Sequence, residues 1–171
     1  MQKIVIFYGS SVGNTRFVAE KLGKIIPNSK VVCVKDATKE MVLESQHMII
    51  GTSTWGIGSF QDDFYNFANV LASLDLSNHK AALFGLGDQF NYPDSFCDGM
   101  GKLYDILQKQ GCTLVGEWPS DDYTFSESQA LRDGQLVGLA LDEDNEPDLT
   151  TYRIKKWSTQ VLSQMGIKLE D

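Results

Sequence analysis

Residues 8–17 read YGSSVGNTRF, and this stretch joins a hydrophobic run to a helical pattern. The run Ile4–Phe7 comes directly before it, and apolar residues recur at helical spacing from Val18 onward. Glycines and hydroxyl residues fill its middle, so backbone amides and hydroxyl groups can converge on an anion at the first turn of the helix. The stretch therefore predicts a strand–loop–helix unit whose loop binds an anionic group. An ordinary strand-to-helix turn is the alternative.

This loop differs from the common nucleotide-binding loops. Gly13 is followed by Asn14, so there is no Walker A sequence, and no G-x-G-x-x-G pattern occurs here. The loop contains no lysine or arginine before Arg16, so neutral hydrogen bonds would hold the anion. Such a loop suits a monophosphate that stays bound better than it suits phosphoryl transfer.

Short apolar runs rich in Ile, Val and Leu recur along the chain without alternating with polar residues. That pattern is typical of strands buried on both faces. The runs are Ile4–Phe7, Val31–Val34, Met48–Ile50, Ala81–Phe84, Thr113–Val115 and Leu136–Leu141. Helical patterns lie between most of them, including one that we expect to begin at Ser95 as N-cap and to end before Gly111.

The alternation of strands and helices predicts right-handed β-α-β units and a doubly wound parallel sheet. Such sheets bind ligands beyond the carboxyl ends of their strands, where the strand order reverses. The loops 8–15, 51–61 and 86–94 are therefore the candidate site. Residues 117–135 break the alternation, because they are polar and aromatic with no helical pattern, and a long loop of this kind is often functional.

Composition and charge limit the function. The 171 residues suggest one domain, and no apolar run approaches the ~20 residues of a membrane helix, so we expect a soluble, intracellular protein. The net charge is −8, and residues 117–148 alone hold ten acidic residues and one basic residue. Such a surface disfavours nucleic acid and attracts basic proteins, although it is alternatively a solvated acidic face. The three cysteines and two histidines lack metal-ligand spacing, so no metal site is predicted.

Two loops each carry one aromatic residue among glycines and small polar residues. Residues 51–60 read GTSTWGIGSF with Trp55, and residues 85–96 read GLGDQFNYPDSF with Tyr92. Aromatic side chains on separate loops at one sheet edge can enclose a flat ring between them. The alternative is that both rings only cap the core.

Together these loops resemble the flavodoxins, which are small electron carriers that bind FMN. The resemblance extends over nearly the whole chain and includes YGSSVGNT, TSTWGIG, GLGDQFNYPDSFCDGMG and LVGLALDEDNEPDLTTYRIKKW. Residues 117–135 resemble the insertion of the long-chain subgroup. The resemblance implies a single domain over residues 1–171, built as a three-layer α/β sandwich. Its five parallel strands would follow the order 2-1-3-4-5, with the fifth strand interrupted by the insertion.

The resemblance also implies a set of residues that bind FMN. The phosphate would be wrapped by Ser10, Ser11, Val12, Gly13, Asn14 and Thr15. Trp55 and Tyr92 would cover the two faces of the ring. The polar edge of the ring would be bound by the backbone of Thr54, Trp55, Gly56, Ile57, Gly58, Gly87 and Asp88. Asp144 and Thr54 would lie near the ribityl chain.

Two positions refine this expectation. The family usually has a hydroxyl residue where this chain has Val12, and one neutral hydrogen bond is worth roughly 0.5–1.5 kcal/mol, so we expect weaker FMN binding.

In flavodoxins the peptide after the loop tryptophan turns over when FMN gains an electron and a proton at N5. Here that peptide is Gly56–Ile57, and glycine enters positive-φ states with little strain, so we expect a well-stabilised neutral semiquinone. The acidic surroundings are expected to lower the second potential.

The resemblance implies a low-potential one-electron carrier with non-covalent FMN. It would be a cytoplasmic monomer that shuttles between a basic redox partner, such as a flavodoxin/ferredoxin reductase, and low-potential acceptors. The main alternative is an FMN-dependent NAD(P)H:quinone reductase on the same fold, which would need space for a second substrate beside the ring. A phosphate-switched receiver is disfavoured, because it needs an aspartate at the end of the third strand, where this chain has Gly51, Thr52 and Ser53. A non-redox scaffold that uses the acidic insertion is a further alternative.

Overall fold

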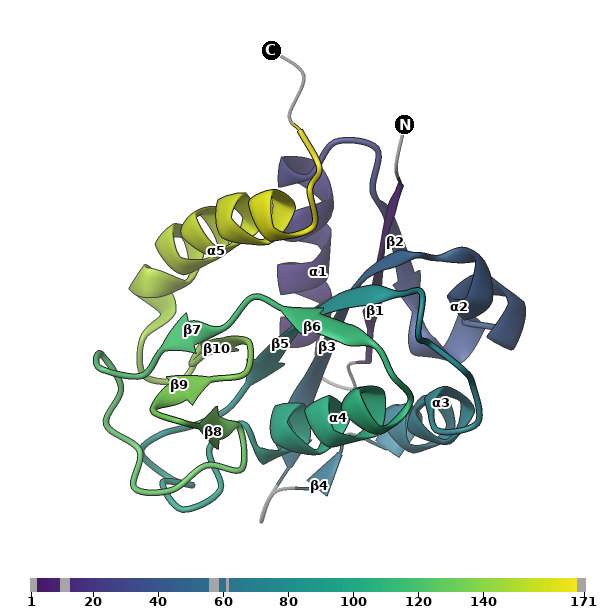
Figure 1. Cartoon of the computed structure of the whole chain (residues 1–171). Helices are drawn as coiled ribbons and strands as arrows, with labels where there is room; N and C mark the ends of the chain where they lie inside the picture. Colours follow the sequence, from purple (N-terminus) through teal and green to yellow (C-terminus); the bar gives the residue numbers. More distant parts are fainter. Residues whose placement is uncertain (1–2, 10–12, 56–58, 61, 169–171) are drawn as a thin grey trace.

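The computed structural model describes residues 3–9, 13–55, 59–60 and 62–168 (Figure 1). A parallel sheet forms its centre, with the strand order β10-β5-β3-β1-β2. These strands are β1 (Ile4–Tyr8), β2 (Lys30–Cys33), β3 (His47–Trp55), β5 (Lys80–Leu86) and β10 (Leu139–Leu141). Short β4 (Ser59–Phe60) pairs antiparallel with the end of β3.

The fifth position in the sheet is filled by two separate pieces of chain. β6 (Thr113–Val115) pairs with the first half of β5, and β10 pairs with its second half. This confirms the order 2-1-3-4-5 with an interrupted fifth strand. The expectation of one continuous strand over Leu136–Leu141 is wrong, because Gln135–Leu136 forms β9 and pairs away from the main sheet. Gly138 separates the two pieces where a Cβ atom would lie 2.2 Å from the Leu83 carbonyl oxygen.

Helices cover both faces of the sheet (Figure 1). α1 (Asn14–Ile25) and α5 (Thr150–Gln164) pack together on one side, and α3 (Asp62–Leu71) and α4 (Asp98–Lys109) pack together on the other. Short α2 (Lys39–Glu44) contacts α3, and the 3₁₀ turns η1 (Val34–Asp36) and η2 (Pro147–Leu149) complete the connections. Among the helices of the described residues, none is both long enough and apolar enough to cross a bilayer.

Burial explains why the sequence folds this way. The central strands are apolar at successive positions because both of their faces are covered, and Ile6, Phe7 and Ile49 are fully buried. Each long helix presents one apolar stripe to the sheet, as Val18 and Leu22 do on α1.

The start of α4 differs from the expectation. Cys97, with φ of 54°, precedes the first residue of the helix, so Ser95 is not the N-cap. Residues before Cys97 turn instead of continuing the helix, because Cys97 itself has a left-handed backbone conformation. The Pro93 carbonyl in this turn accepts hydrogen bonds from the backbone amides of Ser126 and Glu127. The helix does end before Gly111, which adopts a φ of 84° as a left-handed C-terminal glycine does.

The insertion has its own small sheet, which the sequence did not predict. β7 (Trp118–Pro119), β8 (Leu131–Arg132) and β9 (Gln135–Leu136) form an antiparallel sheet in the order β7-β9-β8. Gly101 lets α4 approach this insertion closely, since a Cβ atom there would lie 2.4 Å from the backbone of Gln129. The insertion therefore packs beside the loops at the carboxyl edge of the main sheet (Figure 1).

Candidate functional site

A cleft opens at the carboxyl ends of the strands, between the segments that follow β1, β3, β5 and β10. The described residues that line it are Asn14, Thr15, Ser53, Thr54, Leu86, Gly87, Asp88, Tyr92, Glu143 and Asp144. The strand order reverses between β1 and β3, so the cleft lies where a doubly wound sheet is expected to bind a ligand. Segments that are far apart in the sequence thus form one site.

The start of α1 supplies one wall of the cleft. Gly13 precedes the helix with a φ of 90°, and Thr15 lies in its first turn. The Thr15 Oγ1 atom is buried and has no hydrogen-bond partner among the described residues, and the same is true of the Ser53 Oγ atom. Buried hydroxyl groups without partners are costly, so these two groups fit a ligand that is rich in oxygen atoms.

The end of β3 supplies the floor. The backbone amide of Gly99 donates to Thr54 Oγ1 over 3.0 Å, which orients the threonine side chain. A hydroxyl oxygen that accepts a bond still has its own hydrogen to donate, so Thr54 can address a ligand as well. A Cβ atom on Gly99 would lie 3.2 Å from Thr54 Oγ1, so this glycine permits the close approach of α4.

The loop after β5 carries Tyr92 and is held by Asp88. Asp88 Oδ1 accepts hydrogen bonds from the backbone amides of Phe90 and Asn91, each over 3.0 Å, and the Asp88 carbonyl accepts one from the Tyr92 amide. Burial alone would raise the pKa of Asp88, but the hydrogen bonds from Asn91 and Asn145 hold that pKa below its ordinary value. Tyr92 is thereby presented at the cleft while 46% of its surface stays exposed.

The described lining is acidic on one side and contains no lysine or arginine. Burial, followed by the nearby charges of Asp88 and Asp142, raises the pKa of Asp144. Such a wall disfavours additional negative charge close to it. An anionic group would consequently be held at the opposite end of the cleft, by the neutral groups at the start of α1.

The cleft brings together seven of the residues predicted from the sequence: Asn14, Thr15, Thr54, Gly87, Asp88, Tyr92 and Asp144. Gly13 precedes them at the start of α1, and Trp55 ends β3, where only its backbone is described. Ser10, Ser11, Val12, Gly56, Ile57 and Gly58 lie outside the described residues.

Ser53, Leu86 and Glu143 also line the cleft but were not among the individual residues predicted to bind a ligand, although Ser53 and Leu86 lie within the candidate loops 51–61 and 86–94. Ser53 and Leu86 are the neighbours of predicted residues at strand ends, and that position was the available signal. The histidines have no part in the site: His47 and His79 are buried elsewhere in the fold. Within the described part of the chain, no three His, Cys, Asp or Glu side chains are arranged so that they could hold a metal ion.

This fold and site define a doubly wound α/β protein with a ligand cleft at its topological switch point. The family model for flavodoxin matches residues 6–157. A flavodoxin of Synechococcus elongatus is 40% identical over 170 residues, which cover 98% of this chain and 100% of that protein. A flavodoxin of Haemophilus influenzae is 36% identical over 96% of this chain and 97% of its own length.

Solved structures agree with these sequence matches. The crystal structure of Fusobacterium nucleatum flavodoxin bound to flavin mononucleotide superimposes with a TM-score of 0.91 at 32% identity, and the match covers 98% of this chain and 100% of that one. The chain belongs to the flavodoxin family. Flavodoxins are electron-transfer proteins and not enzymes, so the quinone-reductase alternative is not favoured.

Proposed function

We propose that residues 1–171 act as one domain that binds a single FMN non-covalently and carries electrons one at a time between redox proteins. Membership of the flavodoxin family supports this function, as does the similarity to a flavodoxin whose structure contains FMN. The observation that carries it is the pair of buried hydroxyl groups on Thr15 and Ser53, which line one cleft without partners among the described residues. When bound, FMN supplies the reversible electron uptake, and the protein tunes it.

Different residues of the chain would bind different parts of the cofactor. The phosphate would bind at Ser10–Thr15, where Val12 offers no hydroxyl group. Trp55 and Tyr92 would cover the ring, and the backbone of Thr54, Gly56–Gly58, Gly87 and Asp88 would bind its polar edge. Asp144 and Thr54 would lie beside the ribityl chain, whose hydroxyl groups can form hydrogen bonds with a carboxylate and a threonine hydroxyl.

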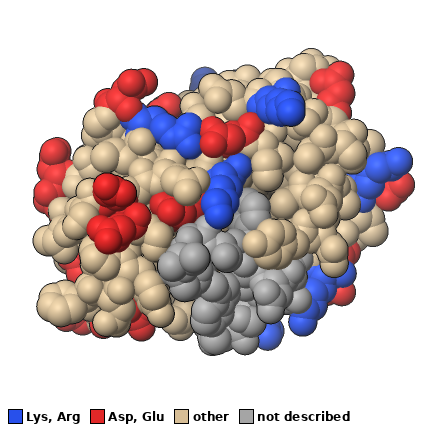
Figure 2. All heavy atoms as spheres, turned by 90° about the horizontal axis from the view of Figure 1, so that it is seen from below, with Lys and Arg blue, Asp and Glu red and all other residues tan. Residues whose placement is uncertain are grey.

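The acidic charge bears on both the potential and the partner. Figure 2 shows the face with the cleft, where acidic side chains gather on the left, the side of the insertion. Negative groups beside the cleft oppose the build-up of negative charge on the bound ring, which favours a low potential for the second electron. The same charge would attract a basic redox protein, such as a reductase, and favours short-lived encounters.

We also assign the chain to the long-chain subgroup, as a cytoplasmic monomer.

Anaerobic reduction of the FMN-loaded protein tests this function. The purified protein is saturated with FMN, freed of excess cofactor and reduced in small steps while its visible absorption is recorded. A one-electron carrier is expected to take up its two electrons in two separate steps. A single two-electron step, together with rapid oxidation of NAD(P)H, would instead support a hydride-accepting enzyme. Failure to retain any FMN would refute the proposal.

A further inference from the structure

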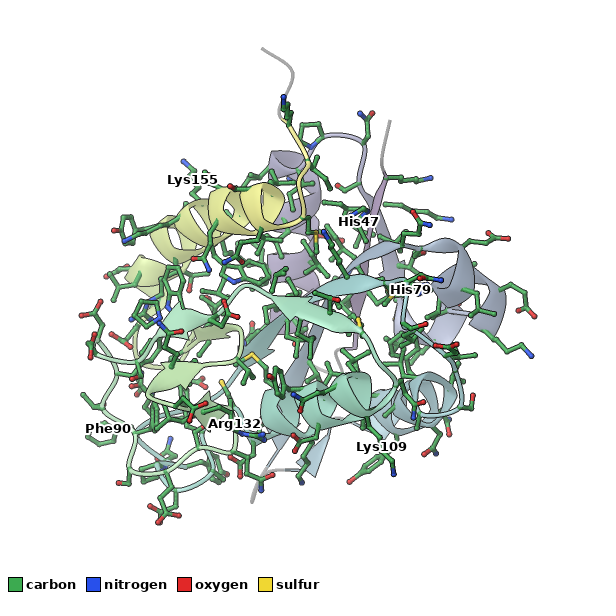
Figure 3. All side chains as sticks on the ribbon, in the orientation of Figure 1. His47, His79, Phe90, Lys109, Arg132 and Lys155 are labelled. Atoms are coloured by element: carbon green, nitrogen blue, oxygen red, sulfur yellow. The ribbon has the colours of Figure 1, made fainter. Side chains whose placement is uncertain are left out.

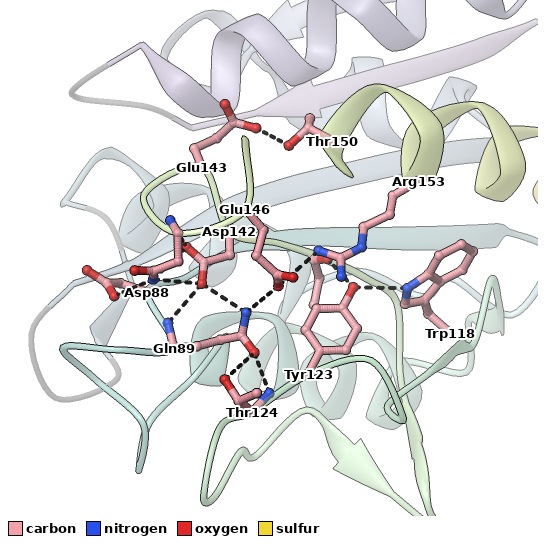
Figure 4. Close-up of polar contacts among 12 residues, drawn as sticks. Asp88, Gln89, Trp118, Tyr123, Thr124, Asp142, Glu143, Glu146, Thr150 and Arg153 are labelled. Carbon is pink, nitrogen blue, oxygen red and sulfur yellow. Dashed lines mark hydrogen bonds and ion pairs between the residues drawn. The ribbon is translucent and has the colours of Figure 1, made fainter. Parts of the chain in front are cut away.

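We propose that Gln89 is a positioning residue for the cofactor: its side-chain amide ties the insertion to the wall of the cleft that carries Tyr92. The effect on FMN rests on the function proposed above. We define the hub as Gln89 with Asp142, Glu146 and Thr124 (Figure 4). Its geometry does not depend on the proposed function.

Gln89 is buried in a loop that is otherwise open to solvent. It is 5% exposed, whereas the next residue, Phe90, is 82% exposed and points away from the body of the protein (Figure 3). A polar side chain that turns inward from an exposed loop must find partners there, because an unsatisfied amide is costly to bury. The burial of Gln89 therefore indicates that its amide is used.

The amide of Gln89 makes every hydrogen bond that it can make. Its Nε2 atom donates to Asp142 Oδ2 over 2.9 Å and to Glu146 Oε1 over 2.6 Å. Its Oε1 atom accepts from the Thr124 backbone amide over 2.6 Å and from Thr124 Oγ1 over 3.3 Å. Two donors and two acceptor sites exhaust a glutamine side chain, so no shorter or apolar residue can replace it fully.

On the insertion side, Thr124 is held by its neighbour Tyr123. The hydroxyl of Tyr123 donates to the Ala140 carbonyl and accepts from Trp118 Nε1 over 3.0 Å. The Arg153 guanidinium lies over the Tyr123 ring, 4.4 Å from its centroid, and bonds Glu146 over 3.4 Å. These contacts with β10, α5 and the insertion hold Tyr123, so the adjoining Thr124 gives Gln89 a well-held attachment.

On the cleft side, the bonds continue to the residues that would meet FMN. The Gln89 backbone amide also donates to Asp142 Oδ2, over 3.1 Å. Asn145 Nδ2 donates to Asp142 Oδ1 over 3.0 Å and to Asp88 Oδ1 over 2.9 Å, so it links these two carboxylates. Because Asp88 holds the turn that ends at Tyr92, a displacement of Gln89 would be transmitted to Tyr92.

A matched pair of glutamine variants tests this role. Gln89→Met keeps the length of the side chain and removes its hydrogen bonds. Gln110→Met makes the same change at the end of α4, where Nε2 donates to the Ala72 carbonyl away from the cleft. FMN affinity is measured by fluorescence titration, and the visible circular dichroism of the bound flavin reports the surroundings of the ring.

We expect Gln89→Met to raise the Kd for FMN about tenfold and to alter the flavin dichroism, because it removes all four side-chain hydrogen bonds that hold this wall of the cleft. Gln110→Met should lower the stability of the apoprotein while its Kd stays within about twofold of the wild type. A merely structural role would lower stability in both variants alike. The proposal is wrong if Gln89→Met keeps both the Kd and the dichroism of the wild type.

Hydrogen exchange of the wild-type apoprotein provides a test that needs neither a variant nor FMN. Thr124 is exposed, but its backbone amide donates a hydrogen bond to Gln89 Oε1. After correction for intrinsic rates, the amide hydrogen of Thr124 should therefore exchange at least about tenfold more slowly than that of nearby Asp122. Equal exchange rates for Thr124 and Asp122 would show that Gln89 does not hold Thr124, and the proposal would be wrong. If the wild type retains no FMN, the proposed function fails, and this exchange result still decides whether the hub exists.

Discussion

Thr15 and Ser53 show how single residues prepare the cleft. Each buries a hydroxyl oxygen that has no partner among the described residues, an arrangement that costs stability in the empty protein. A bound ligand that supplies the missing hydrogen bonds recovers that cost. Cofactor binding and apoprotein stability should therefore respond in opposite directions when such a hydroxyl is removed.

Thr15→Val separates these two effects. The substitution keeps the shape of the side chain and removes the buried hydroxyl, so the free energy of unfolding of the apoprotein should stay unchanged or rise by up to about 1 kcal/mol. FMN should bind roughly 2- to 10-fold more weakly. Urea denaturation and FMN titration measure the two quantities. A clear loss of apoprotein stability with unchanged FMN affinity would mean that Thr15 has an internal role instead.

Asp144 makes a pH-dependent contribution. Asp144 is largely exposed, but partial desolvation, followed by repulsion from Asp88 and Asp142, raises its pKa, so the folded apoprotein holds this proton more tightly than the unfolded chain does. The resulting stability is fully present below the unfolded pKa and is lost as pH rises through the folded pKa. Asp144→Asn should therefore raise apoprotein stability at pH 7, by no more than about 0.5 kcal/mol for an exposed group, and should change little in strong acid. Urea denaturation across this pH range measures it, and a gain confined to acid would contradict the explanation.

At the scale of elements, α4 joins the main sheet to the insertion. Arg132 of β8 forms a bidentate pair with Asp105 of α4, at 2.9 and 3.1 Å, and its guanidinium lies over the Tyr104 ring. Gly101 allows this approach, since nothing larger fits between the helix and the backbone of Gln129. The insertion is consequently packed against the helix, and its position depends on that contact.

Gly101→Ala tests this packing, because two effects of known sign compete. In an ordinary helix the change stabilises by about 1 kcal/mol. Here the new Cβ would lie 2.4 Å from backbone atoms of Gln129, which must move, and overpacking of this kind costs about 1–3 kcal/mol. We expect a net loss in urea denaturation, whereas Lys109→Ala, exposed on the last turn of α4, should change stability by less than about 0.5 kcal/mol. A stabilised Gly101→Ala protein would show that the insertion is not held there.

At the scale of the whole molecule, the charge is distributed unevenly. The net charge of −8 arises from residues 117–148, while the remaining chain is nearly neutral. Lys155 lies on the outer face of α5, away from the insertion (Figure 3), and Lys156 follows it on the same helix. A basic partner would therefore be steered to one side of the protein, next to the cleft.

Electron transfer from the reduced protein to a basic haem protein, used as a probe, should depend strongly on salt. The bimolecular rate constant should fall as ionic strength rises, because screening weakens the attraction. Asp122→Lys, on the exposed surface of the insertion, should slow the reaction at least about twofold at low salt, and Lys155→Glu should not slow it. Stopped-flow absorption measures the rates. Equal slowing by both changes, or no salt dependence, would contradict docking on the acidic side.

Much of this molecule can be predicted from the sequence, and the failures have physical causes. The central strands were predictable because runs such as Ile4–Phe7 are apolar at every position, and the covering helices because apolar residues recur at helical spacing between the runs. The helix start at Asp98 was not, because it follows the left-handed conformation of Cys97, and the turn before Cys97 hydrogen-bonds a segment more than 30 residues away. The β9–β10 break and the small insertion sheet likewise depend on contacts that no local pattern contains.

The sequence by itself determined the class of the protein. Its strand and helix periods define a doubly wound sheet, and the glycine, hydroxyl and aromatic residues at the strand ends mark the cleft. Only the tertiary structure decided which groups share that cleft and what holds it. Gln89 reaches Thr124, 35 positions away, and Asp142, 53 positions away, so its role arises from packing between distant segments. Local propensity extends over a few residues, whereas burial and hydrogen bonding select partners in space.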